Sequence, residues 1–454
     1  MSGLAGSIRS GLRIGRGAKK TSPKAKRTTR AKAKAKEKPL EYTLLVTATM
    51  CLLTFGVVMV FSASSSASLL NNGDSLFYLK RTLMFGAFGL VALKLLSMQR
   101  LEHLRRLTGP ILLGAVGLLL VTKVMGTSAN GAQRWLAFGP IQIQASEIAK
   151  ISLMLYGASL LADRPNLTRD LRSMRPFLLV AGGICALIVV EPDLGTAMVT
   201  AFSVAALLIA AGAKIRHLAM IAGALLLLVL IAVLMEPYRM ARLTSFINPG
   251  ADAAGAGFQG QQASIALGSG GIFGVGIGES VQKAFYLPEA HTDMIAAVIG
   301  EELGLIGISL LVGLYMLFGY AGFRTAQKAK DRYGRLLAAG LTAMILVQAS
   351  INLFAVLGLA PLTGVTLPFV SYGNSSLIVT LAAVGLLLNV ANGGTARMAS
   401  RPSTKSRSLR LVDGGQRRPR NASARGRSSA SSRDRSRRYG GARGSSAGRS
   451  RRAR

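Results

Sequence analysis

Cysteine, histidine, tryptophan and acidic residues are all scarce in this sequence of 454 residues. The two cysteines, Cys51 and Cys185, lie in separate apolar runs, so we expect neither a disulfide nor a metal site there. Only 19 acidic residues stand against 55 Lys and Arg, which gives a formal charge of +36, yet half of all residues are hydrophobic. This composition argues against a compact soluble enzyme, because long apolar runs with few charges are typical of membrane helices.

Most of the charge lies in the two ends of the chain. Residues 1–40 carry a net +12 and residues 393–454 a net +17, which leaves +7 for the residues between them. The first segment alternates Ala with Lys and the second repeats Arg, Ser and Gly, so neither can bury a core and both are predicted to be disordered. We therefore expect two basic tails around a membrane domain at 41–392, and we expect the tails to contact membrane lipids, with no specific nucleic acid as partner.

The middle of the chain contains ten apolar runs of membrane-spanning length. They cover residues 43–63, 79–98, 110–126, 147–162, 177–191, 194–212, 217–235, 294–320, 336–360 and 367–392. The sequence thus predicts an all-α integral membrane protein with ten transmembrane helices. An even number of spans places both termini on the same side.

The loop charges orient this bundle. If the termini are cytoplasmic, the inner loops carry fourteen basic residues, whereas the outer connections carry six: Lys80, Arg81, Arg134, Arg239, Arg242 and Lys283. The positive-inside rule therefore predicts cytoplasmic termini. It also predicts a large extracellular loop, residues 236–293, between the seventh and eighth helices.

This long loop contains the Gly-rich stretch Gly268–Gly278. A nucleotide-binding loop is disfavoured, because no strand precedes the glycines and the topology places them outside the cell. Close packing, or a re-entrant backbone that lines a cavity, is the favoured interpretation.

Asp293 is the most informative charged residue of the outer half, because it opens the eighth apolar run. A carboxylate there could simply cap the helix. However, Glu301 lies about 80° around the helix from Asp293, and acids at two depths on neighbouring faces suggest a polar cleft. His291 is interpreted as an orienting group.

Five motifs together resemble the SEDS family (shape, elongation, division and sporulation). They are Gly131–Leu136 with Gln144–Lys150, Glu191–Thr196, Tyr286–Asp293, Gly300–Gly304 and Pro361–Gly373. They occur in the family's order, and the resemblance covers residues 43–392. The sequences of Gln262–Gly278 and of 280–291 are more similar to the division branch than to the elongation branch, in which Arg commonly replaces Ala290. Asn374 and Met294 depart from the family pattern without removing an ionisable group.

The resemblance implies a peptidoglycan glycosyltransferase that polymerises lipid II at the outer face of the bacterial cytoplasmic membrane, at the division septum. It places the family's essential aspartate at Asp293 and its Arg-Trp pair at Arg134 and Trp135. It also implies a class B penicillin-binding protein and other division proteins as partners.

Lipid II already carries a diphosphate leaving group, so the site needs one base and positive charge, and no cofactor is required by the sequence. We predict Asp293 as the base and assign no protein-held metal, although a divalent cation (Mg²⁺ or Mn²⁺) bridging diphosphate and carboxylate stays open. Trp135 could stack on a sugar or anchor its loop. The predicted substrate-binding residues are Arg134, Trp135, Lys150, Arg239, Arg242, Glu289, His291 and Glu301.

Three alternatives remain open at this point. The same helices and intramembrane charges would suit a transporter that flips lipid II across the membrane. A non-catalytic division scaffold is a second alternative, and an enzyme of the elongation branch is a third.

Overall fold

The structure is a computed structural model that describes residues 39–129, 132–138, 141–248, 255, 257–284 and 286–393. In this part of the chain, nine helices are long and apolar enough to cross a membrane. They are α2 (Leu40–Asn72), α3 (Phe77–Met98), α4 (Leu101–Met125), α5 (Ala145–Asp163), α6 (Leu171–Val190), α8 (Ile215–Leu234), α11 (Ile295–Lys328), α12 (Arg332–Val356) and α13 (Asn374–Ala391). The helical membrane fold that the sequence predicts is therefore confirmed.

A further apolar helix, α7 (Leu194–Ala210), occupies the sixth predicted span, but it has only 17 residues. The count of ten transmembrane helices therefore stays a prediction. The predicted tails, 1–40 and 393–454, fall almost entirely outside the described residues.

The connections outside the spans contain structure that the sequence did not predict. Between α4 and α5 lies an antiparallel sheet of strands β1 (Thr127–Ala129), β2 (Ala132–Phe138) and β3 (Ile141–Gln144). The predicted long loop contains two helices, α9 (Pro237–Ile247) and α10 (Phe258–Gly270), and a 3-10 turn, η1 (Pro165–Arg169), joins α5 to α6. The new elements are short, so hydrophobic runs of membrane length could not reveal them.

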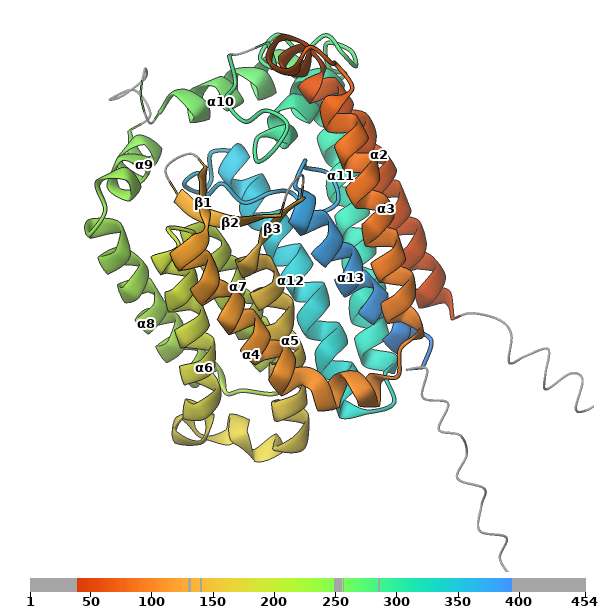
Figure 1. Ribbon diagram of the computed structural model, residues 1–454, viewed down its shortest axis with the longest axis vertical. Helices are drawn as coiled ribbons and strands as arrows, with labels where there is room; N and C mark the ends of the chain where they lie inside the picture. Colours follow the sequence, from red (N-terminus) through yellow and green to blue (C-terminus); the bar gives the residue numbers. More distant parts are fainter. Residues whose placement is uncertain are drawn as a thin grey trace, which may run out of the picture. The chain divides into compact units, whose positions relative to one another are not determined.

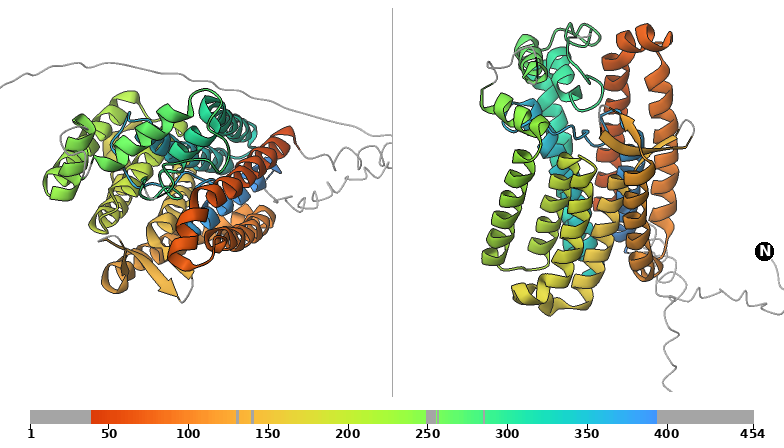
Figure 2. Two further views of the ribbon diagram at one scale, coloured as in Figure 1. Left: turned by 90° about the horizontal axis from the view of Figure 1, so that it is seen from above. Right: turned by 60° about the vertical axis from the view of Figure 1, so that its left-hand side comes forward.

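The start of α2 and the end of α13 lie at the same end of the bundle, whereas α9, α10 and the sheet lie toward the opposite end (Figures 1 and 2). This agrees with an even number of crossings. At the end where α2 starts, Lys328 at the end of α11 pairs with Glu41 at 2.5 Å. The basic residues near this end are the ones that the positive-inside rule assigns to the cytoplasm.

Helices α11, α12 and α13 form the interior of the bundle. Helix α13 packs against α3, α11 packs against α2, and α12 packs against α5, α7 and α11. Helix α8 is the opposite case, since Val233 is its only buried residue among the described side chains. Its apolar surface suits a helix that faces lipid.

Helix α11 is broken at Gly304, where the backbone leaves the helical region with φ 63° and ψ −158°. The Gly-rich segment after α10 packs into this break. The amides of Val275 and Gly276 donate to the carbonyls of Glu301 and Glu302 at 3.0 Å. A Cβ on Gly304 would lie 2.5 Å from the Gly274 nitrogen, so the glycines allow the two backbones to approach. The close packing predicted for this segment is found in the structure.

Candidate functional site

Asp293 lies in the turn that leads into α11 and is only 7% exposed. The turn forms because Glu289 adopts a left-handed backbone (φ 56°) and its carbonyl accepts from the amides of Thr292 and Met294. The Thr292 hydroxyl lies 2.8 Å from Glu289 Oε2 and 3.3 Å from Asp293 Oδ1. These contacts connect an exposed carboxylate, Glu289, with a buried one, Asp293.

The connection between α12 and α13, residues 357–373, forms the other wall of this site. The Asn352 side-chain amide on α12 donates to the Asp293 carbonyl at 2.7 Å and to the Val365 carbonyl at 2.8 Å. Gly364 lies beside the carboxyl, since a Cβ placed there would be 3.9 Å from Asp293 Oδ2 and 4.0 Å from Arg242 Nη1. A side chain at 364 would therefore contact both groups, and the φ of +71° at this position also favours glycine.

Arg242 reaches this space from α9, and its Nη1 donates to the Leu362 carbonyl at 3.0 Å. It is half-buried, as expected for a cation at the edge of a polar site. Its position brings positive charge next to the Asp293 carboxyl. The site therefore combines one buried acid with one oriented guanidinium.

Burial raises the pKa of the Asp293 carboxyl to about 6, and the negative charge of Glu289 adds to the increase. The Arg242 guanidinium and the Thr292 hydroxyl act in the opposite direction. An acid with such a pKa ionises close to neutral pH. This is the range in which a carboxylate is most effective as a general base.

His291 is held by aromatic contacts beside this turn. Its ring centroid lies 4.4 Å from that of Tyr78 on α3 and 5.6 Å from that of Tyr372, and its carbonyl accepts from the Tyr372 amide at 2.9 Å. Burial lowers the pKa of His291, opposed by Glu289. The tilted ring contacts and the backbone hydrogen bond connect the turn to α3 and to the 357–373 connection, and the orienting role of His291 stays a prediction.

Glu301 and Glu302, two turns further along α11, face the loop that precedes the helix. Glu301 accepts from the Ser280 hydroxyl at 2.5 Å and from the Val281 amide at 3.1 Å. Glu302 pairs with Lys283 at 2.8 Å, and the Ser62 hydroxyl lies 2.7 Å from both of its oxygens. Both acids are buried and hydrogen-bonded to protein groups. Glu301 therefore holds the loop in this arrangement, and its predicted contact with substrate stays a prediction.

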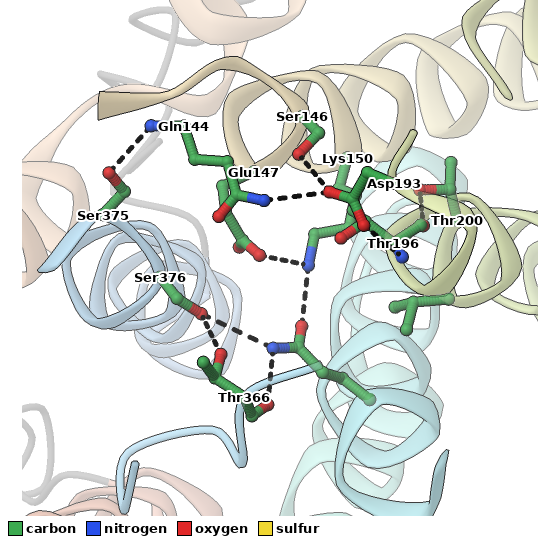
Figure 3. A network of polar contacts seen from close by, with 12 residues as sticks. Gln144, Ser146, Glu147, Lys150, Asp193, Thr196, Thr200, Thr366, Ser375 and Ser376 are labelled. Carbon is green, nitrogen blue, oxygen red and sulfur yellow. Dashed lines mark hydrogen bonds and ion pairs between the residues drawn. The ribbon is translucent and has the colours of Figure 1, made fainter. Parts of the chain in front are cut away.

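Lys150 belongs to a separate buried network near the start of α5 (Figure 3). Its ammonium lies 2.9 Å from Glu147 Oε1 and 2.7 Å from Gln348 Oε1, and Lys150 is 1% exposed. Nearby, Asp193 caps the start of α7 through the Thr196 amide. Contact between Lys150 and a diphosphate would require these bonds to be replaced.

Three cations surround the end of α6. Arg134 on β2 donates to the Pro192 carbonyl, Arg239 on α9 donates to the Val189 carbonyl at 3.1 Å, and Lys123 donates to the Val190 carbonyl at 3.1 Å. Cations at the carbonyl end of a helix complement its dipole. Arg239 also donates to the Ala232 carbonyl at 3.0 Å, so it ties α9 to α6 and α8.

Glu191 lies near two of these cations, Lys123 and Arg134. It is buried, and neither of its carboxyl oxygens has a hydrogen-bond partner within the described part of the chain. Burial raises its pKa to about 8, with a smaller contribution from Asp193 and opposition from Lys123 and Arg134. The carboxyl is therefore largely protonated at neutral pH.

The structure thus separates the predicted site residues into groups. Asp293, Glu289, His291 and Arg242 gather at one site. Arg134, Trp135 and Arg239 belong to the sheet and to the surroundings of α6, where Trp135 is half-buried and pairs with Gln144 across the sheet.

The sequence interpretation missed Asn352, Gln348 and Gly364. The sequence did contain a signal for the two amides, because Gln348 and Asn352 are four residues apart in an apolar run and therefore share one helix face.

A family model described as "Cell cycle protein", which represents FtsW, RodA and SpoVE, matches residues 42–395. A protein of Thioalkalivibrio sulfidiphilus named "Probable peptidoglycan glycosyltransferase FtsW" is 42% identical over 353 residues, which cover 76% of this chain and 88% of that protein. Stage V sporulation protein E of Bacillus subtilis is 40% identical over 352 residues, covering 76% of this chain and 96% of that protein.

Solved structures resemble the fold as well. A chain from a study of how a peptidoglycan synthase complex coordinates polymerization and crosslinking superposes with a TM-score of 0.64 at 32% identity, covering 76% of this chain and 96% of that chain. The rod shape determining protein RodA of Thermus thermophilus gives a TM-score of 0.58 at 29% identity, over 76% of this chain and 95% of that chain.

Proposed function

Because the chain belongs to the cell cycle protein family of FtsW, RodA and SpoVE and is a multi-pass membrane peptidoglycan glycosyltransferase, we propose that Asp293 is its general base. The substrate in this proposal is lipid II, a disaccharide peptide linked through a diphosphate to undecaprenol. The observation that carries the assignment is the buried Asp293 carboxyl, whose pKa of about 6 lies near the working pH, beside the Arg242 guanidinium.

The proposed reaction is a displacement at the first carbon of the donor sugar. Asp293 accepts the proton of the 4-hydroxyl of the acceptor N-acetylglucosamine, and the oxygen forms the new glycosidic bond. The bond to the diphosphate breaks at the same carbon, and its electron pair leaves with undecaprenyl diphosphate. One base is sufficient, because the diphosphate leaves without a strong general acid.

Arg242 is the best-placed group for the negative charge of the departing diphosphate. Its guanidinium is oriented by the Leu362 carbonyl and lies on the same side of Gly364 as the Asp293 carboxyl. A preorganised cation next to the reacting bond stabilises charge that develops in the transition state. We propose Arg134, Lys150 and Arg239 as further diphosphate contacts, with Trp135, Glu289, His291 and Glu301 shaping the rest of the substrate site.

A divalent cation stays part of the proposal: Asp293 would contribute a ligand to it, and the cation would supply positive charge that stabilises the departing diphosphate. The described residues contain no group of three or more His, Cys, Asp or Glu that could hold a metal ion. Oxygens of the substrate would therefore have to supply most of the ligands of Mg²⁺ or Mn²⁺.

We assign the enzyme to cell division, at the septum, with a class B penicillin-binding protein as the crosslinking partner. The FtsW relatives support the division role, and the peptidoglycan synthase complex supports a partner that crosslinks. Fluorescent fusions in dividing cells test the location. A signal along the side wall, without enrichment at the septum, would favour the elongation role.

Polymerisation in detergent micelles separates the enzyme from a flippase or a scaffold, because micelles have no two sides between which a lipid could be flipped. The purified protein, with its transpeptidase partner, is given labelled lipid II, and the products are separated on a gel. We expect a ladder of long glycan strands. Unconverted lipid II, together with lipid II flipping in proteoliposomes, would instead support the transporter.

A further inference from the structure

Helix α12 carries two buried amide side chains on one face, Gln348 and Asn352, which are 3% and 2% exposed. They are four residues apart, so they lie one helical turn above each other. Buried amides in a membrane helix are costly unless their hydrogen bonds are made. Their partners therefore indicate why amides occur here in place of aliphatic residues.

Asn352 binds two carbonyl oxygens, those of Asp293 and Val365, at 2.7 and 2.8 Å. Only the NH₂ group of an amide can donate to two carbonyls, so the orientation of this side chain is determined by its partners. Its own oxygen is buried and has no partner among the described residues. The side chain is therefore placed to hold the backbone on either side of the carboxyl site.

Gln348 makes the corresponding contacts one turn earlier. Its NH₂ group donates to the Thr366 carbonyl at 3.0 Å, and its oxygen accepts from the Lys150 ammonium at 2.7 Å. Val365 and Thr366 are neighbours, so the two amides bind consecutive backbone carbonyls of the 357–373 connection. On its other side, Lys150 binds Glu147 at 2.9 Å.

The held loop also carries the groups that surround Asp293. The Leu362 carbonyl orients Arg242, Gly364 lies against the Asp293 carboxyl, and the Tyr372 amide binds the His291 carbonyl. A shift of Val365 and Thr366 would therefore change the distance between the base and the guanidinium. Misplacement of reacting groups by about 1 Å can cost on the order of 100-fold in rate.

We propose that Gln348 and Asn352 are positioning residues of the polymerising reaction. They fix the 357–373 connection to α12, and they thereby fix Asp293 relative to Arg242 and to the Lys150–Glu147 pair. This proposal rests on Asp293 being the base. Neither amide is assigned a contact with the substrate.

The test compares Asn352→Leu and Gln348→Met, which keep approximate side-chain volume but remove the amides, with Ser350→Ala as the control. Ser350 lies on the same helix between the two amides and is exposed. Each protein is purified with its transpeptidase partner, checked for thermal stability, and assayed for polymerisation of lipid II across pH. Asp293→Asn is assayed in parallel.

For Asn352→Leu we expect kcat to fall by roughly 10- to 100-fold while KM for lipid II stays within about twofold, because orientation is lost and binding is kept. We also expect the acid limb of the pH profile to move to higher pH, because Asp293 loses part of its interaction with Arg242. Gln348→Met should reduce kcat less. The double variant should lose less than the product of the two single effects, because both amides act through the same loop.

A folded Asn352→Leu protein with the wild-type kcat and pH profile would overturn the proposal, if Asp293→Asn is inactive in the same assay. A rise in KM at constant kcat would also overturn it. If Asn352→Leu does not fold, Gln348→Met and its pH profile decide the question in the same way. Full activity of Asp293→Asn would instead remove the base assignment itself, and the positioning proposal with it.

Discussion

Asp293 has the burial and the neighbours that a carboxylate base requires. An exposed aspartate would ionise near pH 4 and bind a proton weakly. Burial and Glu289 raise the pKa of Asp293 to about 6, while Arg242 keeps the ionised form accessible. The balance between these opposing contributions can be tested by titration and by removal of the cation.

The first prediction concerns the pH dependence of polymerisation. A base must be ionised to accept a proton, so activity should be constant above the pKa of Asp293 and fall as pH drops below about 6. Values of kcat/KM, from initial rates with lipid II below KM between pH 5 and pH 8, measure this limb for the substrate-free enzyme. A rate independent of pH over that range, with the protein still folded at pH 5, would contradict the assignment.

The second prediction compares two arginines of α9. Removal of Arg242 takes away a positive charge that lowers the pKa of Asp293, so Arg242→Ala should move the acid limb to higher pH and reduce kcat by about 10- to 100-fold. Arg242→Lys should recover part of the loss, because the charge is kept. Arg239→Ala is the matched control for the pH profile and not for kcat, since Arg239 binds the carbonyls of Val189 and Ala232 and does not contribute to the pKa of Asp293. Equal shifts of the pH profile in both alanine variants would refute a specific role for Arg242.

Asp293 and Arg242 were both predicted as site residues from the sequence, Asp293 because it opens a long apolar run. Their proximity to each other, and to Asn352 and Gly364, could not be predicted, because Arg242, Asn352 and Gly364 come from three different parts of the chain. Contacts between distant segments depend on packing, which periodicity does not encode. For the same reason, the sequence could not show that Lys150 lies in a different network from Asp293.

Helix α11 is a long element with a glycine-dependent break. At Gly304 the helix exchanges its own hydrogen bonds for bonds with the Gly-rich segment, including those from the amides of Val275 and Gly276. Exchange of this kind keeps backbone groups hydrogen-bonded at a buried point of the helix. The break also allows Glu301 and Glu302 to hold Ser280 and Lys283.

The third prediction concerns this break. Gly304→Ala should destabilise the protein by about 1–3 kcal/mol, because the new Cβ would lie 2.5 Å from the Gly274 nitrogen and the backbone has a positive φ. Gly313→Ala, in the same helix, should have little effect, since a Cβ there meets nothing within 4 Å. Thermal unfolding of both purified variants provides the measurement. Equal unfolding temperatures would show that the close backbone approach at Gly304 does not contribute to the stability of the protein.

The apolar runs predicted the helices well and their ends less well. Helix α2 continues to Asn72, beyond the predicted end at residue 63, because the less hydrophobic residues 64–72 contain no Pro or Gly, and the helix ends at the left-handed Gly73. The sheet and α9 were missed for a related reason. Short elements at a membrane surface carry no long apolar run, although β3 does show the alternation Ile141-Gln-Ile-Gln144.

The distribution of charge over the whole molecule predicts its orientation in the membrane. The net +36 is mostly carried by the two segments at the ends of the chain, and the start of α2 and the end of α13 lie at one end of the bundle. The remaining outer cations include Arg242 and Lys283, both engaged in defined contacts. The positive-inside rule therefore predicts that the Asp293 site lies on the outer face of the membrane.

The fourth prediction tests this topology by labelling intact cells with a membrane-impermeant thiol reagent. In a background where Cys51 and Cys185 are replaced by serine, Thr244→Cys on α9 should react, and Ser173→Cys near the start of α6 should react only after the membrane is permeabilised. Both positions are exposed in the structure. The reverse pattern of labelling would place the Asp293 site on the cytoplasmic side.

The most direct test of Asp293 as the base is the rate of polymerisation by Asp293→Asn, because this change removes the proton acceptor and keeps the size of the side chain. Wild type and variant are purified with the transpeptidase partner and compared for lipid II binding and for strand formation. We predict binding within about threefold of wild type and a loss of at least about 100-fold in kcat. Strand formation at the wild-type rate by a folded Asp293→Asn protein would contradict the account.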